Sequence, residues 1–235
     1  MRKPLTRVGF AIAAFIAALL ATTGLPGCQQ LFTTSLAEPL ARDSISLPDT
    51  LTSEQAADLA QQAQDSDNVA LATALVDTLT NQITDPSTQT ELAAAAASAA
   101  IVASGASDAL LDAFADVLAS GDTSTVDAAA LLATIQAGST ADVLTALGYL
   151  EALSDPSSIE GTELNATDYV IAAIIVAASA LPAGTDPVND DLSGYTGSAQ
   201  YTSAAAMVAT ALTMVDSGSA SEDLLNNLAS LLQIP

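Results

Sequence analysis

"YVIAAIIVAASAL", residues 169–181, decides the fold, because it is apolar on every side of a helix. A helix with no polar face cannot lie on a water-exposed surface, so other elements must enclose it. The stretch is shorter than the roughly 20 residues that a membrane-crossing helix needs. It therefore predicts a central core helix surrounded by further helices of the same domain.

The segments on both sides of this stretch also have helical spacing. Leu71, Leu75, Leu79 and Ile83 form one apolar row, while no segment shows the alternation typical of a strand. We expect about nine helices from this spacing. They are placed near residues 53–64, 67–83, 89–103, 108–119, 125–137, 141–153, 166–181, 199–216 and 221–233.

Residues that start and stop helices alternate along the chain in the order that this assignment requires. The predicted capping boxes are Thr52 with Gln55, Thr88 with Glu91, and Ser219 with Glu222. The predicted simple N-caps are Ser107, Ser124, Thr140 and Asn165. The glycines predicted to end helices in a left-handed conformation are Gly105, Gly121, Gly138 and Gly218.

Short connections between residues 103 and 141 predict helices that pair antiparallel as αα-hairpins. Alanine-rich faces such as "LAAAAASAAIVA", residues 92–103, allow helices to approach closely. We therefore expect an all-α fold, either a compact bundle or a superhelical array of short antiparallel helices. The hairpin-like units recur about every 33 to 36 residues, near the tetratricopeptide period, but the signature of that family is absent. The Asp-Pro pairs that follow several predicted helices are interpreted as ordinary turns, and a degenerate repeat of helical hairpins remains the alternative.

The first thirty residues have the organisation of an export signal. A basic start, "MRKPLTR", precedes the uncharged run of residues 8–25. The last residue of this run, Leu25, is followed by Pro26, Gly27 and Cys28. Cys28 is the only cysteine in the chain. This stretch resembles the lipobox of bacterial lipoproteins, although Pro26 is not the usual residue at its position. The resemblance implies cleavage after Gly27, acylation of Cys28 and anchoring to a membrane by several acyl chains.

Two other interpretations of this segment remain open: an uncleaved N-terminal membrane helix, and an ordinary signal peptide with a cysteine near its end by chance. By the same resemblance, Gln29 after the modified cysteine favours the outer membrane in a cell that has two membranes. The expected organisation is a signal peptide (1–27), a lipidated N-terminus with a flexible tether (28–51), and one helical domain (52–235). Alternatively, apolar tether residues such as Phe32 pack back on the domain or dip into the bilayer surface.

The charge after Cys28 is strongly negative and excludes several classes of partner. All 27 acidic residues lie there, opposed only by Arg42, which gives a net charge of −26. Such a chain repels nucleic acid and anionic lipid headgroups and attracts cations or basic partners. The same composition is typical of proteins that work in concentrated salt.

The composition also removes most catalytic machinery. Without histidine there is no Ser-His-Asp triad, and without lysine after Cys28 there is no Schiff-base chemistry. Carboxylate-pair glycosidase chemistry remains possible in principle, but few aromatic residues are present to form a sugar platform. We therefore expect a protein that is not an enzyme and holds no cofactor.

One loop has the spacing of a calcium site. Asn189, Asp191 and Ser193 lie two residues apart and are followed by Gly194, as in the first half of an EF-hand loop. Gln200 occupies the position where that loop needs a bidentate Glu, so a polar surface loop is the competing interpretation. Asp108, Asp112 and Asp116 form an acidic row that a cation or basic partner could neutralise, although a solvated helix face is the usual explanation of such a row.

The sequence thus predicts a membrane-anchored, non-catalytic helical lipoprotein of the bacterial cell envelope that serves as a structural or protein-interaction module. Its partners would be the membrane, through Cys28, and other envelope proteins. The alternative is a lipoprotein that binds a cation or a small solute with its acidic surface, with calcium at residues 189–193 as the candidate ligand. A third hypothesis, an enzyme that uses only carboxylates, would require two buried acidic residues facing one pocket.

Overall fold

A computed structural model describes residues 45–110, 127–155, 159, 162, 164–185, 190, 192 and 194–215. These ranges are helical and contain no strand, which confirms the all-α prediction for this part of the chain. The helices are α2 (Ser53–Asp65), α3 (Val69–Gln82), α4 (Thr90–Ala103), α6 (Ala128–Gly138), α7 (Ala141–Ala152), α8 (Ala166–Ser179) and α9 (Ala199–Thr213). A further helical segment begins at residue 106, and the helix predicted near 221–233 lies outside the described residues.

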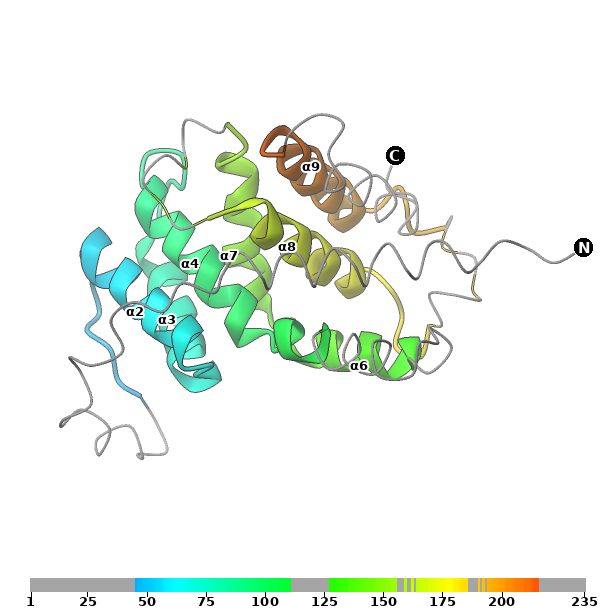
Figure 1. Ribbon diagram of the computed structural model, residues 1–235, viewed down its shortest axis with the longest axis horizontal. Helices are drawn as coiled ribbons and strands as arrows, with labels where there is room; N and C mark the ends of the chain where they lie inside the picture. The colour runs from blue at the N-terminus through cyan, green and yellow to red at the C-terminus, as the bar shows by residue number, and fades with distance from the viewer. Residues whose placement is uncertain are drawn as a thin grey trace, which may run out of the picture.

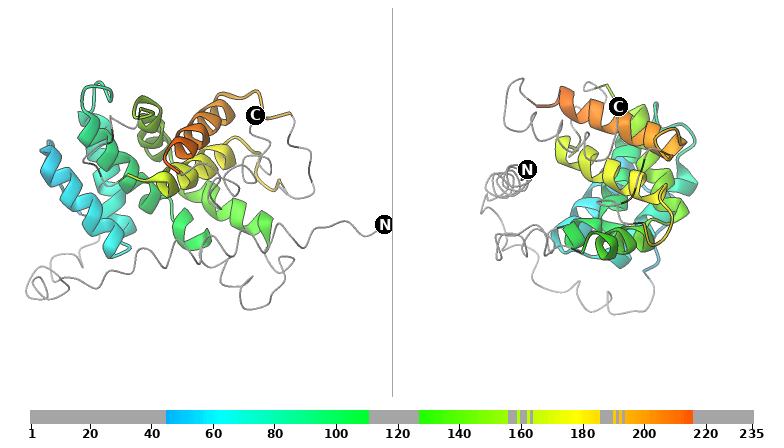
Figure 2. Two further views of the ribbon diagram at one scale, coloured as in Figure 1. Left: turned by 45° about the horizontal axis from the view of Figure 1, so that its top comes forward. Right: turned by 90° about the vertical axis from the view of Figure 1, so that its right-hand side faces the viewer.

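The helices form a compact bundle in which α4 packs against α2, α3 and α7 (Figure 1). One end consists of α2 and α3, which both pack against α4, and the other end consists of the pair α8 and α9. Helix α7 lies beside α4 and connects the two ends, while α6 packs against α8. The left view of Figure 2 shows the same order, with α2 and α3 at one end and the pair α8 and α9 toward the other.

The predicted core helix is buried as expected but is not the central one. Most of the residues of α8 are buried, whereas Val170, Ile171 and Ile174 on one side are only half-buried. The central position belongs to α4, in which residues 92–97 and 99–103 are all buried. Small alanine side chains explain this, because they let α2, α3 and α7 approach the α4 backbone closely.

Several predicted caps are present in the structure. Thr52 and Gln55 form the reciprocal capping box of α2, with Thr52 Oγ1 accepting a hydrogen bond from Gln55 N. Thr140 caps α7 by accepting from Val143 N. Asn165 caps α8, and Asp168 completes the box by accepting from Asn165 N at 2.8 Å.

The capping box predicted at Thr88 and Glu91 is wrong. The N-cap of α4 is Gln89, whose side chain makes no capping bond and instead accepts from Thr84 N and Asp85 N. The Thr88 hydroxyl donates to the Asp85 carbonyl in the preceding turn. The Asp85-Pro86-Ser87 turn therefore takes up the polar groups that the sequence pattern assigned to the helix start.

Two of the predicted helix-ending glycines have different roles. Gly105 has a φ of +63°, as predicted for a left-handed residue after a helix. Gly138 is the last residue of α6 and does not have a positive φ; instead, a Cβ there would overlap the backbone carbonyl of Ser104. Gly138 therefore permits the end of α6 to touch the turn after α4.

The connection between α6 and α7 also differs from the predicted antiparallel hairpin. The chain turns by 91° between Ala129–Gly138 and Ala141–Ala152 instead of folding back. Only Ser139 and Thr140 separate the helices, and Thr140 is already the N-cap of α7. With so short a connection, α6 extends away from α7 and packs against α8.

Candidate functional site

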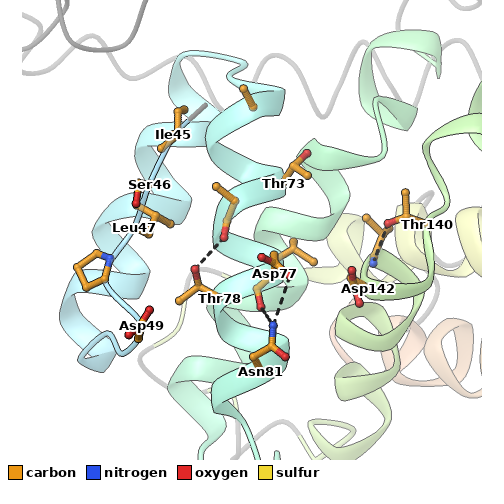
Figure 3. Close-up of a pocket in the computed structure, with 15 residues that line it drawn as sticks. Ile45, Ser46, Leu47, Asp49, Thr73, Asp77, Thr78, Asn81, Thr140 and Asp142 are labelled. Atoms are coloured by element: carbon orange, nitrogen blue, oxygen red, sulfur yellow. Dashed lines mark hydrogen bonds between the residues drawn. The ribbon is translucent and has the colours of Figure 1, made fainter. Parts of the chain in front are cut away.

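A broad cavity, with a volume of about 840 Å³, lies beside α3 in the described part of the chain. Its walls come from Ile45–Asp49, from the outer face of α3 and from the start of α7. Figure 3 shows the 45–49 segment on one side, Thr73, Asp77 and Asn81 of α3 in the middle, and Asp142 of α7 on the other side. Because Thr73, Asp77, Asn81 and Asp142 are exposed, the cavity is open to solvent.

Residues 45–50, which we call the strap, form the first wall of this cavity. The chain is fixed at the end of the strap by Gln82, whose Oε1 accepts from Leu51 N at 2.9 Å and whose Nε2 donates to Leu51 O at 2.7 Å. Leu51 is buried, with 6% of its surface exposed. The last residues of the segment assigned to the tether therefore lie against the helical domain.

The cavity is acidic. Asp49, Asp77 and Asp142 line it, and no lysine or arginine follows Arg42 in the sequence. Asp142 lies in the first turn of α7, where the helix dipole stabilises a negative charge, and Asp77 accepts a hydrogen bond from the side chain of Asn81. In the described ranges, no group of three or more His, Cys, Asp or Glu side chains is arranged to hold a metal ion.

The cavity and its lining residues could not be predicted from the sequence. Asp77 and Asp142 belong to separate helices, and the cavity forms only when α3, α7 and the strap come together. The acidic residue at the first turn of α7 was visible in the sequence, but its neighbours across the cavity were not.

The sequence-predicted sites fall mainly outside the described residues. This is the case for Gly27 and Cys28, for Asn189, Asp191 and Ser193, and for Asp112 and Asp116. Their near neighbours are described in part: Asp108 and Asp190 are exposed, whereas Leu192 is buried. The predicted lipidation, cleavage and calcium sites thus stay predictions.

Asp168 is the carboxylate with the most altered environment among the described residues. It is 8% exposed, and burial raises its pKa to about 6, partly opposed by the hydrogen bond from Asn165 N. The neighbouring Tyr169 is fully buried, and its hydroxyl donates to Leu153 O at 2.6 Å. Burial and the charge of Asp168 raise the pKa of Tyr169 to about 12. Asp168 does not line the cavity, so its position indicates a structural role in capping α8.

Across the described ranges, no single helix is long and apolar enough to cross a membrane. The bent pair α6 and α7 reaches the required length and composition only when its two helices are taken together.

Comparison of the chain with models of protein families, with curated proteins and with solved structures finds no match. The function of the chain is therefore inferred from its own residues.

Proposed function

We propose that this chain is a membrane-anchored, non-catalytic helical lipoprotein of the bacterial cell envelope that serves as a structural or protein-interaction module. The observation that carries the proposal is the position of Cys28, the only cysteine, directly after a basic start and a long apolar run. Acyl chains on this residue would hold the helical domain at a membrane surface.

The composition supports the non-catalytic part of the proposal. The chain has no histidine, and all its lysine and arginine residues except Arg42 precede Cys28. Histidine and lysine, which often act as general bases or activate a nucleophile, are therefore missing from the mature chain. The described cavity is lined by polar and apolar side chains together, and its three carboxylates, Asp49, Asp77 and Asp142, are exposed. A packed domain with a polar, acidic surface is suited to holding a position or a partner.

Metabolic labelling with a fatty acid tests the anchor. We expect the wild-type chain to incorporate label and to lose Met1–Gly27, and Cys28→Ser to do neither. A matched control, Cys28→Ser with Ser35→Cys, keeps one thiol but moves it out of the lipobox, and it should also remain unlabelled. Undiminished labelling of Cys28→Ser would refute the proposal.

The same resemblance gives a test of location in cells with two membranes. Gln29 favours the outer membrane, whereas Asp at this position favours retention in the inner membrane. Gln29→Asp should therefore move the lipidated chain from the outer to the inner membrane fraction on a density gradient. Equal distribution of the two variants would contradict the outer-membrane assignment while leaving the anchor itself intact.

A further inference from the structure

We propose that the strap, residues 45–50, is a releasable wall of the cavity that detaches from the helical bundle while the bundle stays folded. Detachment would open the cavity beside α3 on the side that the strap now closes. This device is independent of the acyl chains, because it depends only on contacts within the domain.

The strap is held to the bundle weakly along its own length. From Ile45 to Thr50 it makes no hydrogen bond with another described residue. Only Ile45 and Leu47 are half-buried and packed against the core, while Ser46 and residues 48–50 are exposed. Segments with few buried contacts and no hydrogen bonds are those that open locally without global unfolding.

The chain directly after the strap is, in contrast, firmly fixed. Leu51 is buried and joined to Gln82 by two hydrogen bonds, one to its N–H and one to its carbonyl. The next residue, Thr52, begins α2 with a complete capping box. The start of α2 therefore keeps all its polar partners when the strap leaves, and Leu51 acts as the fixed end about which the strap turns.

The position of the strap explains why its release would matter. Figure 3 shows it running along the α2–α3 side of the cavity, with Ile45 toward the Thr73 end and Asp49 toward the Asn81 end. It contributes Ile45–Asp49 to the cavity lining. Release of the strap would therefore change the shape of the cavity while every helix around it stays in place.

Trypsin offers a direct test, because Arg42 is the only trypsin site after Cys28. Ser46→Arg introduces a site at an exposed strap position, and Gln62→Arg introduces a control site at an exposed position in α2. The full-length chain is digested, and each rate is divided by the rate for a synthetic peptide with the same local sequence. Cleavage is assigned by mass spectrometry, so lipidation of Cys28 does not affect the result.

We expect the strap site to be cut at least about tenfold faster than the α2 site, at a rate unchanged by low urea, as is typical of local opening. The fragment that begins at Leu47 should keep the melting temperature of the intact bundle. Adding Leu47→Ser should accelerate cleavage of the strap site, because it removes one of the two half-buried anchors. Adding Gln82→Ala should accelerate cleavage of the α2 site, because opening then spreads past Leu51.

Two results would overturn the proposal. If the strap site is cut only as fast as the α2 site, the strap opens only with the whole bundle. If Leu47→Ser leaves the normalised rate unchanged, Leu47 does not hold the strap against the core, and there is no docked state to release. Hydrogen exchange of the wild-type chain gives a check without substitutions: α3 amides must remain protected under conditions in which the strap is cut.

Discussion

Tyr169 and Tyr201 are both fully buried, but only the hydroxyl of Tyr169 has a hydrogen-bond partner. Tyr169 donates to Leu153 O at 2.6 Å, whereas the hydroxyl of Tyr201 is buried without a hydrogen-bond partner. Tyr169→Phe should lower the free energy of unfolding by about 1–2 kcal/mol, because the Leu153 carbonyl then loses its donor. Tyr201→Phe should be neutral or stabilising, because it removes a buried polar atom that has no partner. Urea unfolding followed by circular dichroism measures both; equal losses would contradict the assigned hydrogen bonding.

Asp168 provides a pH dependence with an unusual sign for a carboxylate. Its pKa is raised from 3.8 to about 6 by burial, so the folded state binds the proton more tightly than the unfolded chain does. Stability should therefore rise as the pH falls from about 6 to about 4, by at most roughly 3 kcal/mol from this group. Asp168→Asn keeps an oxygen acceptor for Asn165 N but has no charge, so its stability should depend less on pH in this range. The difference between the two chains isolates Asp168 from the other carboxylates, and parallel pH profiles would contradict the prediction.

At the scale of the helices, Gly138 and Gly148 are two helical glycines that differ in the space around them. A Cβ at Gly138 would overlap the Ser104 carbonyl, whereas a Cβ at Gly148, inside α7, would meet nothing within 4 Å. Gly138→Ala should lower the unfolding free energy by about 2 kcal/mol or more, because backbone must move to make room. Gly148→Ala should raise it by roughly 0.5–1 kcal/mol, the usual gain from replacing glycine inside a helix. Thermal unfolding of the two variants checks the signs, and a stabilising Gly138→Ala would disprove the close approach of α6 to the turn after α4.

The elements that could be predicted from the sequence are those set by local signals. Thr52, Thr140 and Asn165 start helices because each side chain bonds an amide two or three residues ahead, and this spacing is visible in the sequence. Thr88 has the same kind of pattern but does not cap a helix, because its hydroxyl donates to the Asp85 carbonyl in the preceding turn. Short-range sequence patterns therefore predicted where helices lie, but they could not decide whether a given side chain caps a helix or bonds within a turn.

Features that depend on distant residues were not predictable. Gln82 bonds to Leu51, and Gln136 donates to the carbonyls of Ala178 and Leu181 at the end of α8. Each pairing joins residues more than thirty positions apart, and no pattern of residue spacing predicts it. The cavity is of the same kind, since its walls come from the strap, α3 and α7. The central position of α4 was missed because small alanine side chains give no hydropathic signal as strong as that of Ile and Val in α8.

At the scale of the whole molecule, repulsion between the many carboxylates opposes folding. After Cys28 the chain carries 27 acidic residues and one arginine, and folding brings these carboxylates closer together than they are in the unfolded chain. Burial of an alanine-rich core must outweigh this repulsion at ordinary ionic strength. Salt that screens the repulsion should therefore stabilise the fold without changing any specific contact.

We predict that the melting temperature of residues 29–235 rises steadily between about 0.05 and 1 M sodium chloride, as the Debye length falls to about 3 Å. Sodium chloride is preferred to sulfate, because sulfate also strengthens the burial of apolar surface. If a low concentration of Ca²⁺ produces most of the gain instead, discrete cation sites are responsible, and Asn189, Asp191 and Ser193 are the first positions to substitute. That outcome would favour the cation-binding alternative over a purely structural module. A melting temperature that responds to neither salt would mean that the carboxylates are already well separated and solvated, and the repulsion argument would then be wrong.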